Sequence, residues 1–431
     1  MSKPRHHGSG FSSTPKQRAS KTKATRNFSN HIADEHKAAA LINQGKLQEA
    51  EVICKQLISI DTENHISYCN LAAIYGMQGK LEKCIGLLKK ALELKPNLPE
   101  SHYNLGNALK DRGALSDAIN AYNTALKLKP NYPEAQLNLG IIFKAQGDLD
   151  AAITSFNTAL QLKPNYPQAH FNLGNTFREK GDLDNAIASF KTALQLKPNY
   201  AEAHINLGNT LREKVDLTSA AASFNKALEL KPNHAEAHWN LALTMLLKGD
   251  YKNGWGEYEW RAKTKTNESK PHSLPKCDQW NNEPNTNHSN QLLLISEQGL
   301  GDTLQFMRYA KALRNEGISV SLCAQPKLHN LIRASGIDPS PLTPRQANQV
   351  DKGQWMPLLS LPKHLGVSPS NPIITEPYIK TTEELITKWA NTLGATKKPI
   401  IGINWQGNPK AEKNWLQGRS LALDAFAPIT R

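Results

Sequence analysis

Apolar and polar positions between about residues 31 and 262 follow a helical pattern that repeats at a shift of 34 residues. The near-copies read YNLGNALKDRGALSDAINAYNTALKLKPN, LNLGIIFKAQGDLDAAITSFNTALQLKPN, FNLGNTFREKGDLDNAIASFKTALQLKPN and INLGNTLREKVDLTSAAASFNKALELKPN. A fixed period of this length is typical of an array of helix pairs in which each repeat contacts only its neighbours. The pattern therefore predicts an α-solenoid and argues against a single globular core.

Each repeat combines small and large apolar residues at fixed offsets. Gly174 and Ala186 allow two antiparallel helices to approach closely. Phe177 and Phe190 fill the space that remains, and Pro198 ends the second helix. The combination resembles the tetratricopeptide-repeat (TPR) pattern. The array spans residues 31–262, with a degenerate cap over 31–64 and six repeats that begin near His65, Pro99, Pro133, Pro167, Ala201 and Ala235.

Two repeats depart from the common pattern. In the fifth, Val215 replaces the glycine of the turn between the two helices, so this turn either adopts another conformation or carries strain. The sixth ends with the bulky residues Trp255, Tyr258 and Trp260. Large side chains at the end of an array suggest a terminal repeat that packs onto the segment following it.

Asparagine recurs at one position of the first helix in every repeat, and we call this set the asparagine ladder: Asn70, Asn104, Asn138, Asn172, Asn206 and Asn240. Further along the same helices lie Asn107, Asn175 and Asn209, and then the basic row of Lys110, Lys144, Arg178 and Arg212. In the TPR fold the first helices line the concave face. An asparagine side chain both donates and accepts, so the ladder predicts binding of an extended, acid-containing peptide through its backbone. Alternatively, asparagine is simply common at this position in the repeat family.

Periodicity also explains residues that could be mistaken for metal ligands. The sequence Asp148-Leu149-Asp150 lies at the turn between two helices, where aspartate is favoured for local reasons. Histidines occur once per repeat, too far apart to share an ion. The cysteines lack a metal-ligand spacing, and we interpret Cys54, Cys69 and Cys84 as reduced core thiols. No bound metal is predicted.

Charge and hydropathy indicate where the protein acts. The net charge is +14, and residues 1–30 carry seven basic residues with no acid before Asp34. This tail is predicted to be disordered, and its basic residues are not interleaved with aromatic residues in the way that would favour nucleic acid as a partner. The chain has no apolar stretch long enough to cross a membrane and no secretory signal, so we expect a cytoplasmic protein whose partner is a peptide or another protein.

A polar connector over residues 263–290 leads to a different pattern. Residues 291–296 and 318–325 read as buried strands, and residues 304–317 and 326–336 read as helices. The order predicts a βαβ unit of an open parallel sheet. A loop with the sequence EQGLGDT follows the first strand, and it lacks the third glycine of a dinucleotide-binding fingerprint.

Three residues in this loop are candidates for chemistry. Gly299 and Gly301 would let a ligand approach the backbone at the carboxyl end of the strand. Asp302 stands at the start of the next helix, where it is expected to form a capping box with Gln305.

The segments EQGLGDTLQFMRYAKAL, PLLSLPKHLG, EPYIK and PIIGINWQGNPKAEKNWLQGRSLALDAF resemble the bacterial TPR glycosyltransferases, relatives of the heptosyltransferases and, more distantly, of the O-linked N-acetylglucosamine transferases. The resemblance covers the chain from about residue 235 onward. It implies a Rossmann-like GT-B lobe over 291–396, the start of a second lobe over 397–431, no bound cofactor, and a nucleotide-sugar as co-substrate. It also implies Asp302 as the base, with Gly299 and Gly301 in the acceptor loop.

The same resemblance places a donor-phosphate loop in the second lobe, formed by Gly407, Asn408, Lys410 and Arg419. Alternatively, these residues belong to an ordinary surface loop. The chain holds only the first strand and loop of that lobe, so most of the donor site is expected to be absent. Two functions follow: a glycosyltransferase whose repeats present the acceptor, or a non-catalytic interaction module with a remnant transferase lobe.

Overall fold

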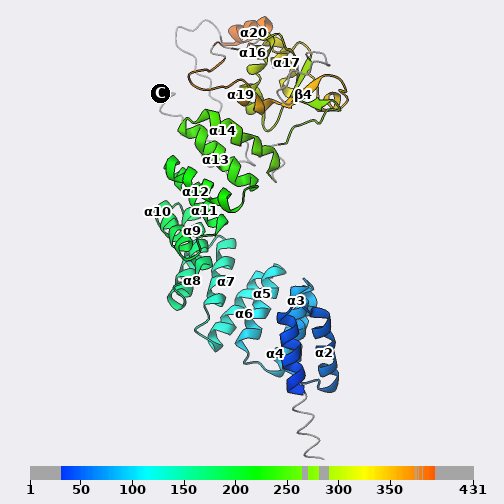
Figure 1. Cartoon of the computed structure of the whole chain (residues 1–431), viewed down its shortest axis with the longest axis vertical. Helices are drawn as coiled ribbons and strands as arrows, with labels where there is room; N and C mark the ends of the chain where they lie inside the picture. Colours follow the sequence, from blue (N-terminus) through cyan, green and yellow to red (C-terminus); the bar gives the residue numbers. More distant parts are fainter. Residues whose placement is uncertain are drawn as a thin grey trace, which may run out of the picture. The chain divides into compact units, whose positions relative to one another are not determined.

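A computed structural model describes residues 31–264, 270–280, 291–373, 376, 378–380 and 382–393. The chain separates into two compact units, Met1–Lys265 and Thr266–Arg431, and each is described by itself (Figure 1). Predictions on the basic tail (1–30) and on the donor-phosphate loop (Gly407, Asn408, Lys410 and Arg419) lie outside the described residues.

The first unit is a series of antiparallel helix pairs (Figure 1). After a helical stretch at 31–43, the elements are α2 (Leu47–Ile60), α3 (His65–Met77), α4 (Leu81–Leu94), α5 (Pro99–Asp111), α6 (Leu115–Leu128), α7 (Pro133–Ala145), α8 (Leu149–Leu162), α9 (Pro167–Lys180), α10 (Leu183–Leu196), α11 (Ala201–Glu213), α12 (Leu217–Leu230), α13 (Ala235–Lys248), α14 (Tyr251–Tyr258) and the 3₁₀ turn η1 (Glu259–Lys263). Proline begins α5, α7 and α9, where its missing N–H costs nothing.

Each central repeat is held together by an aromatic ring against a glycine. A Cβ atom placed on Gly140 would lie 2.5 Å from the ring of Phe156, and one on Gly174 would lie 2.8 Å from the ring of Phe190. Gly106 and Gly208 meet aromatic rings in the same way. Only glycine fits at this crossing, which confirms the predicted close approach of the two helices.

The turn inside each helix pair uses a left-handed residue. Gly147 and Gly181 have φ values of 82° and 85°, and Val215 adopts a φ of 65° at the equivalent position. Of the two alternatives for this turn, the structure shows the strained one, because a β-branched residue is disfavoured there. Asp148 and Asp182 cap the helices that follow, each accepting a hydrogen bond from a backbone N–H.

The aromatic residues at the end of the last repeat pack against the first helix of the same repeat. Tyr258 packs against Trp239, with ring centroids 4.8 Å apart, and Trp260 stacks on His238 at 3.8 Å. These contacts lead back to α13 of the same repeat, so the expectation that Tyr258 and Trp260 pack on a following segment does not account for them.

All five cysteines are free thiols. Cys54 and Cys84 are buried in the core of the first repeats, and burial raises the pKa of the Cys54 thiol to about 11. The thiols there are protonated at neutral pH, as expected for reduced core residues.

The second unit contains a small sheet with strand order β1-β4-β2-β3, and every neighbouring pair is parallel. The strands are β1 (Asp278–Gln279), β2 (Gln291–Ile295), β3 (Ser319–Cys323) and β4 (Gln354–Pro357). The helical elements are α15 (Leu300–Phe306), α16 (Tyr309–Asn315), η3 (Pro326–Leu328), α17 (His329–Ala334), α18 (Pro344–Ala347), η4 (Leu358–Ser360), α19 (Leu361–His364) and α20 (Glu383–Leu393).

The parallel pairing of β2 and β3 confirms the predicted βαβ unit. The helix predicted over 304–317 is instead two short helices, α15 and α16, separated at Met307 and Arg308. Strand β4 was not predicted, although its sequence QWMP begins a short apolar run after the polar segment DKG. The sheet is small, and a complete Rossmann-like lobe is not established by it.

Candidate peptide-binding surface

The first helices of the repeats form one face of the array. Helices α3, α5, α7, α9 and α11 each contact the first helix of the next repeat, whereas contacts between successive second helices are sparser in the described part of the chain. An array whose first helices lie closer together curves toward them. The first helices therefore line the inner face, as in other solenoids that bind along a concave surface.

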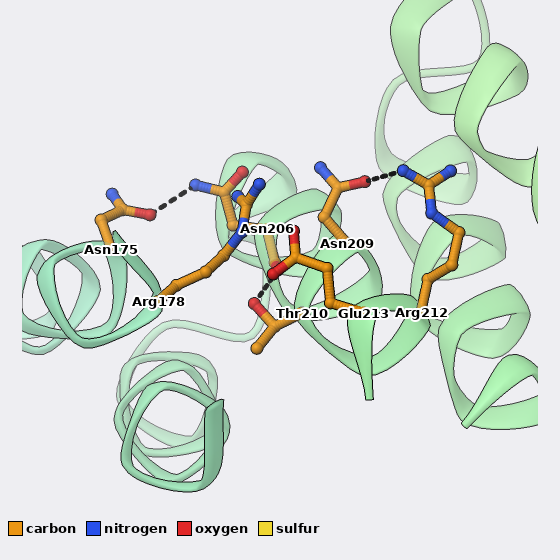
Figure 2. A network of polar contacts seen from close by, with 7 residues as sticks. All are labelled: Asn175, Arg178, Asn206, Asn209, Thr210, Arg212 and Glu213. Atoms are coloured by element: carbon orange, nitrogen blue, oxygen red, sulfur yellow. Dashed lines mark hydrogen bonds and ion pairs between the residues drawn. The ribbon is translucent and has the colours of Figure 1, made fainter. Parts of the chain in front are cut away.

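The asparagine ladder lies on these first helices, and some of its members bridge neighbouring repeats. Asn206 Nδ2 donates to Asn175 Oδ1 at 2.7 Å, from α11 to α9 (Figure 2). Asn138 Nδ2 donates to Asn107 Oδ1 at 2.8 Å, from α7 to α5. These two bonds tie successive repeats together on the inner face, which is a structural role that the sequence did not reveal.

The remaining hydrogen-bonding capacity differs from one ladder residue to the next. Asn138 uses both amide hydrogens, because Nδ2 also donates to Tyr103 Oη at 3.2 Å, and it keeps only its oxygen. Asn206 keeps its oxygen and one hydrogen, as does Asn172, which donates to the Gln168 carbonyl. The side chains of Asn70, Asn104 and Asn240 make no hydrogen bond to other described residues. A two-point contact to a peptide backbone is thus open at every ladder position except Asn138.

Asparagine–asparagine hydrogen bonds between neighbouring repeats do not form at every ladder position, for a reason visible in the sequence. The partner position on the preceding first helix holds asparagine at Asn107 and Asn175, but Ala73 and Ile141 occupy it before Asn104 and Asn172. Neither alanine nor isoleucine can accept a hydrogen bond. Asn104 and Asn172 are therefore left to other partners, and Asn104 is exposed.

The basic row is partly neutralised by acids of the next repeat. Lys144 Nζ lies 3.0 Å from Glu179, and Arg178 Nε donates to Glu213 at 3.0 Å. Each of these acids directly follows an arginine of the basic row, as Arg178-Glu179 and Arg212-Glu213. This recurring Arg-Glu pair is the sequence signal that could have identified them as partners of the row. Lys110 is 3.6 Å from its own neighbour Asp111. Most of the row therefore presents paired charges to a ligand.

Arg212 is the exception in the basic row. Its guanidinium donates to Asn209 Oδ1 at 3.3 Å (Figure 2) and to the Asn240 carbonyl at 3.4 Å. No carboxylate of the described residues lies within 4.0 Å of it. Burial lowers the pKa of Arg212, but a guanidinium remains protonated at neutral pH.

Asp302 lies in the first turn of α15, which follows the loop at the carboxyl end of β2, a central strand of the sheet. Its Oδ2 accepts a hydrogen bond from the Gly299 N–H at 3.1 Å. Asp302 is thus the third residue of α15 and Gly299 precedes the helix, so the expected capping box of Asp302 with Gln305 is wrong. Gly301 lies in the first turn of α15. Asp302 is half-buried.

The periodic histidines have a structural role. His102, His170, His204 and His238 each place Nε2 within 2.8 to 3.2 Å of a proline carbonyl in the preceding inter-repeat loop. Among the described residues, no group of three or more histidine, cysteine, aspartate or glutamate side chains could hold a metal ion. Nor does any helix of the described segments have the length and apolar character needed to cross a membrane.

The successive helix pairs define a helical-repeat array. The repeats themselves match the family described as TPR repeat, over residues 77–113, 106–147, 140–179, 174–215 and 208–249. Together these matches cover residues 77–249, and this part of the chain is similar to TPR repeats. The family match does not extend to the second unit.

Several solved structures are similar to part of the chain. YrrB, described as a TPR protein with an unusual peptide-binding site, is 25% identical over 43% of this chain and 95% of its own, with a TM-score of 0.37. MamA from Desulfovibrio magneticus is 26% identical over 39% of this chain and 94% of its own, with a TM-score of 0.37. The Cut9–Hcn1 complex is 23% identical over 51% of this chain but only 44% of its own, with a TM-score of 0.43. A comparison with curated proteins finds no match.

Proposed function

We propose that the repeats are a scaffold that binds an extended peptide of a partner protein along the inner face. The observation that carries the proposal is the unused hydrogen-bonding capacity of the asparagine ladder. Five of its six members retain a donor and an acceptor on a row of first helices that approach one another. A peptide in extended conformation presents the complementary donor and acceptor at regular intervals, so its backbone can be held without demanding particular side chains.

Two side chains of the ladder are already held in place before a ligand binds. Asn138 and Asn206 are fixed by bonds to the preceding repeat, so those amides lose little freedom when a ligand arrives. The same bonds limit what a test can change, because removing either amide also loosens two repeats. The test is therefore confined to Asn104, Asn172 and Asn240, which donate to no neighbouring repeat.

Replacing Asn104, Asn172 and Asn240 together with alanine should weaken peptide binding at least tenfold. Each hydrogen bond contributes about 0.5 to 1.5 kcal/mol, so three contribute at least about 1.5 kcal/mol. The ligand is a peptide selected from a random library on the intact chain, and its Kd is measured by fluorescence anisotropy. The matched control replaces Asn123, Asn157 and Asn225, which are exposed on second helices, with alanine.

The control variant should bind the peptide as the unchanged chain does. Circular dichroism confirms that both variants keep their helical content. Equal affinity of the two variants, or failure of the library to yield any peptide that binds, would contradict the proposed role of the ladder.

A second candidate function is sugar transfer by the second unit, as the glycosyltransferase resemblance implies. The observation that favours it is the position of Asp302 at the carboxyl end of a parallel strand, where open α/β sheets bind ligands. In this role Asp302 accepts the proton of the attacking hydroxyl while the nucleoside diphosphate leaves. Gly299 and Gly301 would line the acceptor side, and the GT-B architecture and nucleotide-sugar donor belong to this proposal.

Sugar transfer by the second unit should depend on Asp302. Asp302→Asn keeps an acceptor for the Gly299 N–H but removes the base, so transfer should fall by about a hundredfold or more while donor binding is unchanged. Titration calorimetry with nucleotide-diphosphate sugars and a transfer assay measure the two effects, with Gln305→Ala as the exposed control. Transfer that survives Asp302→Asn would argue against this function.

A further inference from the structure

The basic row follows a pairing rule that fails at one end. Each paired cation bonds an acid 35 residues later, at the position after the basic-row residue of the next repeat: Lys144 with Glu179, and Arg178 with Glu213. For Arg212 the equivalent position is Leu247. Leu247 is 67% exposed. An apolar side chain that remains open to solvent thus replaces the acid that would neutralise Arg212.

Arg212 is a half-buried cation whose hydrogen-bond partners are both neutral. Its two contacts are the Asn209 side-chain oxygen and the Asn240 backbone carbonyl. The acid next to it in sequence, Glu213, is paired with Arg178, whose Nε lies 3.0 Å from Glu213 Oε1. Figure 2 labels Arg178, Arg212 and Glu213. A guanidinium has five N–H donors, of which two are used here. Three donors and a full charge, already partly removed from water, remain available on the inner face.

Lys110 offers a useful comparison within the same row. Its equivalent acid position is also lost, because Ala145 stands there. Lys110 has a substitute, since its ammonium lies 3.6 Å from Asp111. In the described part of the chain, Arg212 is therefore the member of the basic row without any carboxylate.

We propose that Arg212 receives an aspartate or glutamate side chain of the bound peptide and so fixes the register of that peptide on the asparagine ladder. This proposal rests on the proposed function, and it adds a preference for peptides that carry an acidic residue. An arginine can hold a carboxylate through two parallel N–H bonds, and the Arg178–Glu213 pair shows that this inner face accommodates such an ion pair one repeat earlier. The ligand carboxylate takes the place that Glu179 and Glu213 occupy for Lys144 and Arg178.

The substitution Leu247→Glu tests the proposal without removing Arg212. It restores the missing acid, which should pair with Arg212 and compete with the peptide. Arg212→Gln removes the cation directly. Each change should raise the Kd of a selected acidic peptide at least about tenfold, because hydrogen bonds to charged groups are among the stronger ones. Lys144→Gln is the control, since its charge is already satisfied by Glu179 and Lys144 lies two repeats before Arg212, and it should change the Kd less than threefold.

The peptide supplies the second half of the experiment. Replacing its acidic residue with asparagine or glutamine should weaken binding to the unchanged chain and have little further effect on Leu247→Glu or Arg212→Gln. If selected peptides show no acid, or if Leu247→Glu leaves the Kd unchanged, the Arg212 proposal is wrong, while the ladder can still hold the backbone. If the ladder variant of Asn104, Asn172 and Asn240 binds normally, the proposed function fails instead. A library that yields no binding peptide overturns both.

Discussion

Replacing Phe156 with alanine should lower the free energy of unfolding of the repeats around it by about 3 to 5 kcal/mol. The ring is fully buried and belongs to a cluster that includes Ala169 and Leu173 of the next repeat. Its loss leaves a cavity between α7 and α8 and also weakens their contact with α9. In a repeat array, stability is a sum of repeat and neighbour contributions, so the damage should spread to the adjacent repeat.

The opposite change is made at Gly140, the residue on which the ring rests. In Gly140→Ala the new methyl group lies about 2.5 Å from a ring carbon of Phe156, and overpacking of this kind costs about 1 to 3 kcal/mol. Alanine regains up to about 1 kcal/mol through its helix propensity. In the double variant the methyl group fills part of the cavity, so the total loss should be smaller than the sum by about 1 to 2 kcal/mol.

Hydrogen exchange followed by mass spectrometry measures these effects, because it reports protection separately for α7, α8 and the second unit. Gly86→Ala is the control, since Gly86 lies within α4 and a Cβ there meets no atom within 4 Å. That variant should be unchanged or more stable. Strict additivity of Gly140→Ala and Phe156→Ala would contradict the close contact between the two residues.

The repeats were predictable because their information is local and repeated. Gly140 with Phe156 and Gly174 with Phe190 report the same contact, and prolines such as Pro167 begin helices for a local reason. Even the exception at Val215 could be framed as two alternatives, because the turn demands one residue in the left-handed region. A pattern that recurs in every repeat constrains the fold far better than any single occurrence.

The chemistry of the inner face was only partly predictable. The positions of the asparagine ladder and of the basic row follow from the repeat, but their partners lie one repeat away. Asn107 and Tyr103 accept both amide hydrogens of Asn138, so these hydrogens are not available to a ligand. Glu213 pairs with Arg178, so the charge of Arg178 is already neutralised. The sequence does not show which of several nearby groups an amide will bond. The hydrogen bonds between ladder residues and asparagines of the preceding repeat, and the ion pairs, were therefore found only in the structure.

In the second unit the reasons for failure are different. Two-residue and four-residue strands such as β1 and β4 have no periodicity to detect. The break between α15 and α16 falls at Met307 and Arg308, which are ordinary helix formers, so tertiary packing decides it. The role of Asp302 in chemistry stays a prediction. The sites inferred at Gly407, Asn408, Lys410 and Arg419 lie outside the described residues.

The parallel sheet of the second unit should depend on Gly353. This residue precedes β4 with a φ of 80°, and a Cβ there would lie 2.7 Å from the Gln291 carbonyl oxygen of β2. In Gly353→Ala the left-handed conformation costs about 1 to 2 kcal/mol, and the overlap with the backbone of a neighbouring strand adds about 1 to 3 kcal/mol. The variant should therefore lose about 2 to 5 kcal/mol of the free energy of unfolding of this unit.

Gly317→Ala separates the two causes. Gly317 has nearly the same φ, 82°, but a Cβ on it would meet no atom within 4 Å. It should lose about 1 kcal/mol, because the strain is partly offset by the lower entropy of the unfolded alanine chain. Hydrogen exchange of the β2 and β4 amides measures both variants, and the amides of α7 and α8 should stay unchanged. Equal losses for Gly317→Ala and Gly353→Ala would mean that the close approach of Gly353 to β2 contributes nothing to the sheet.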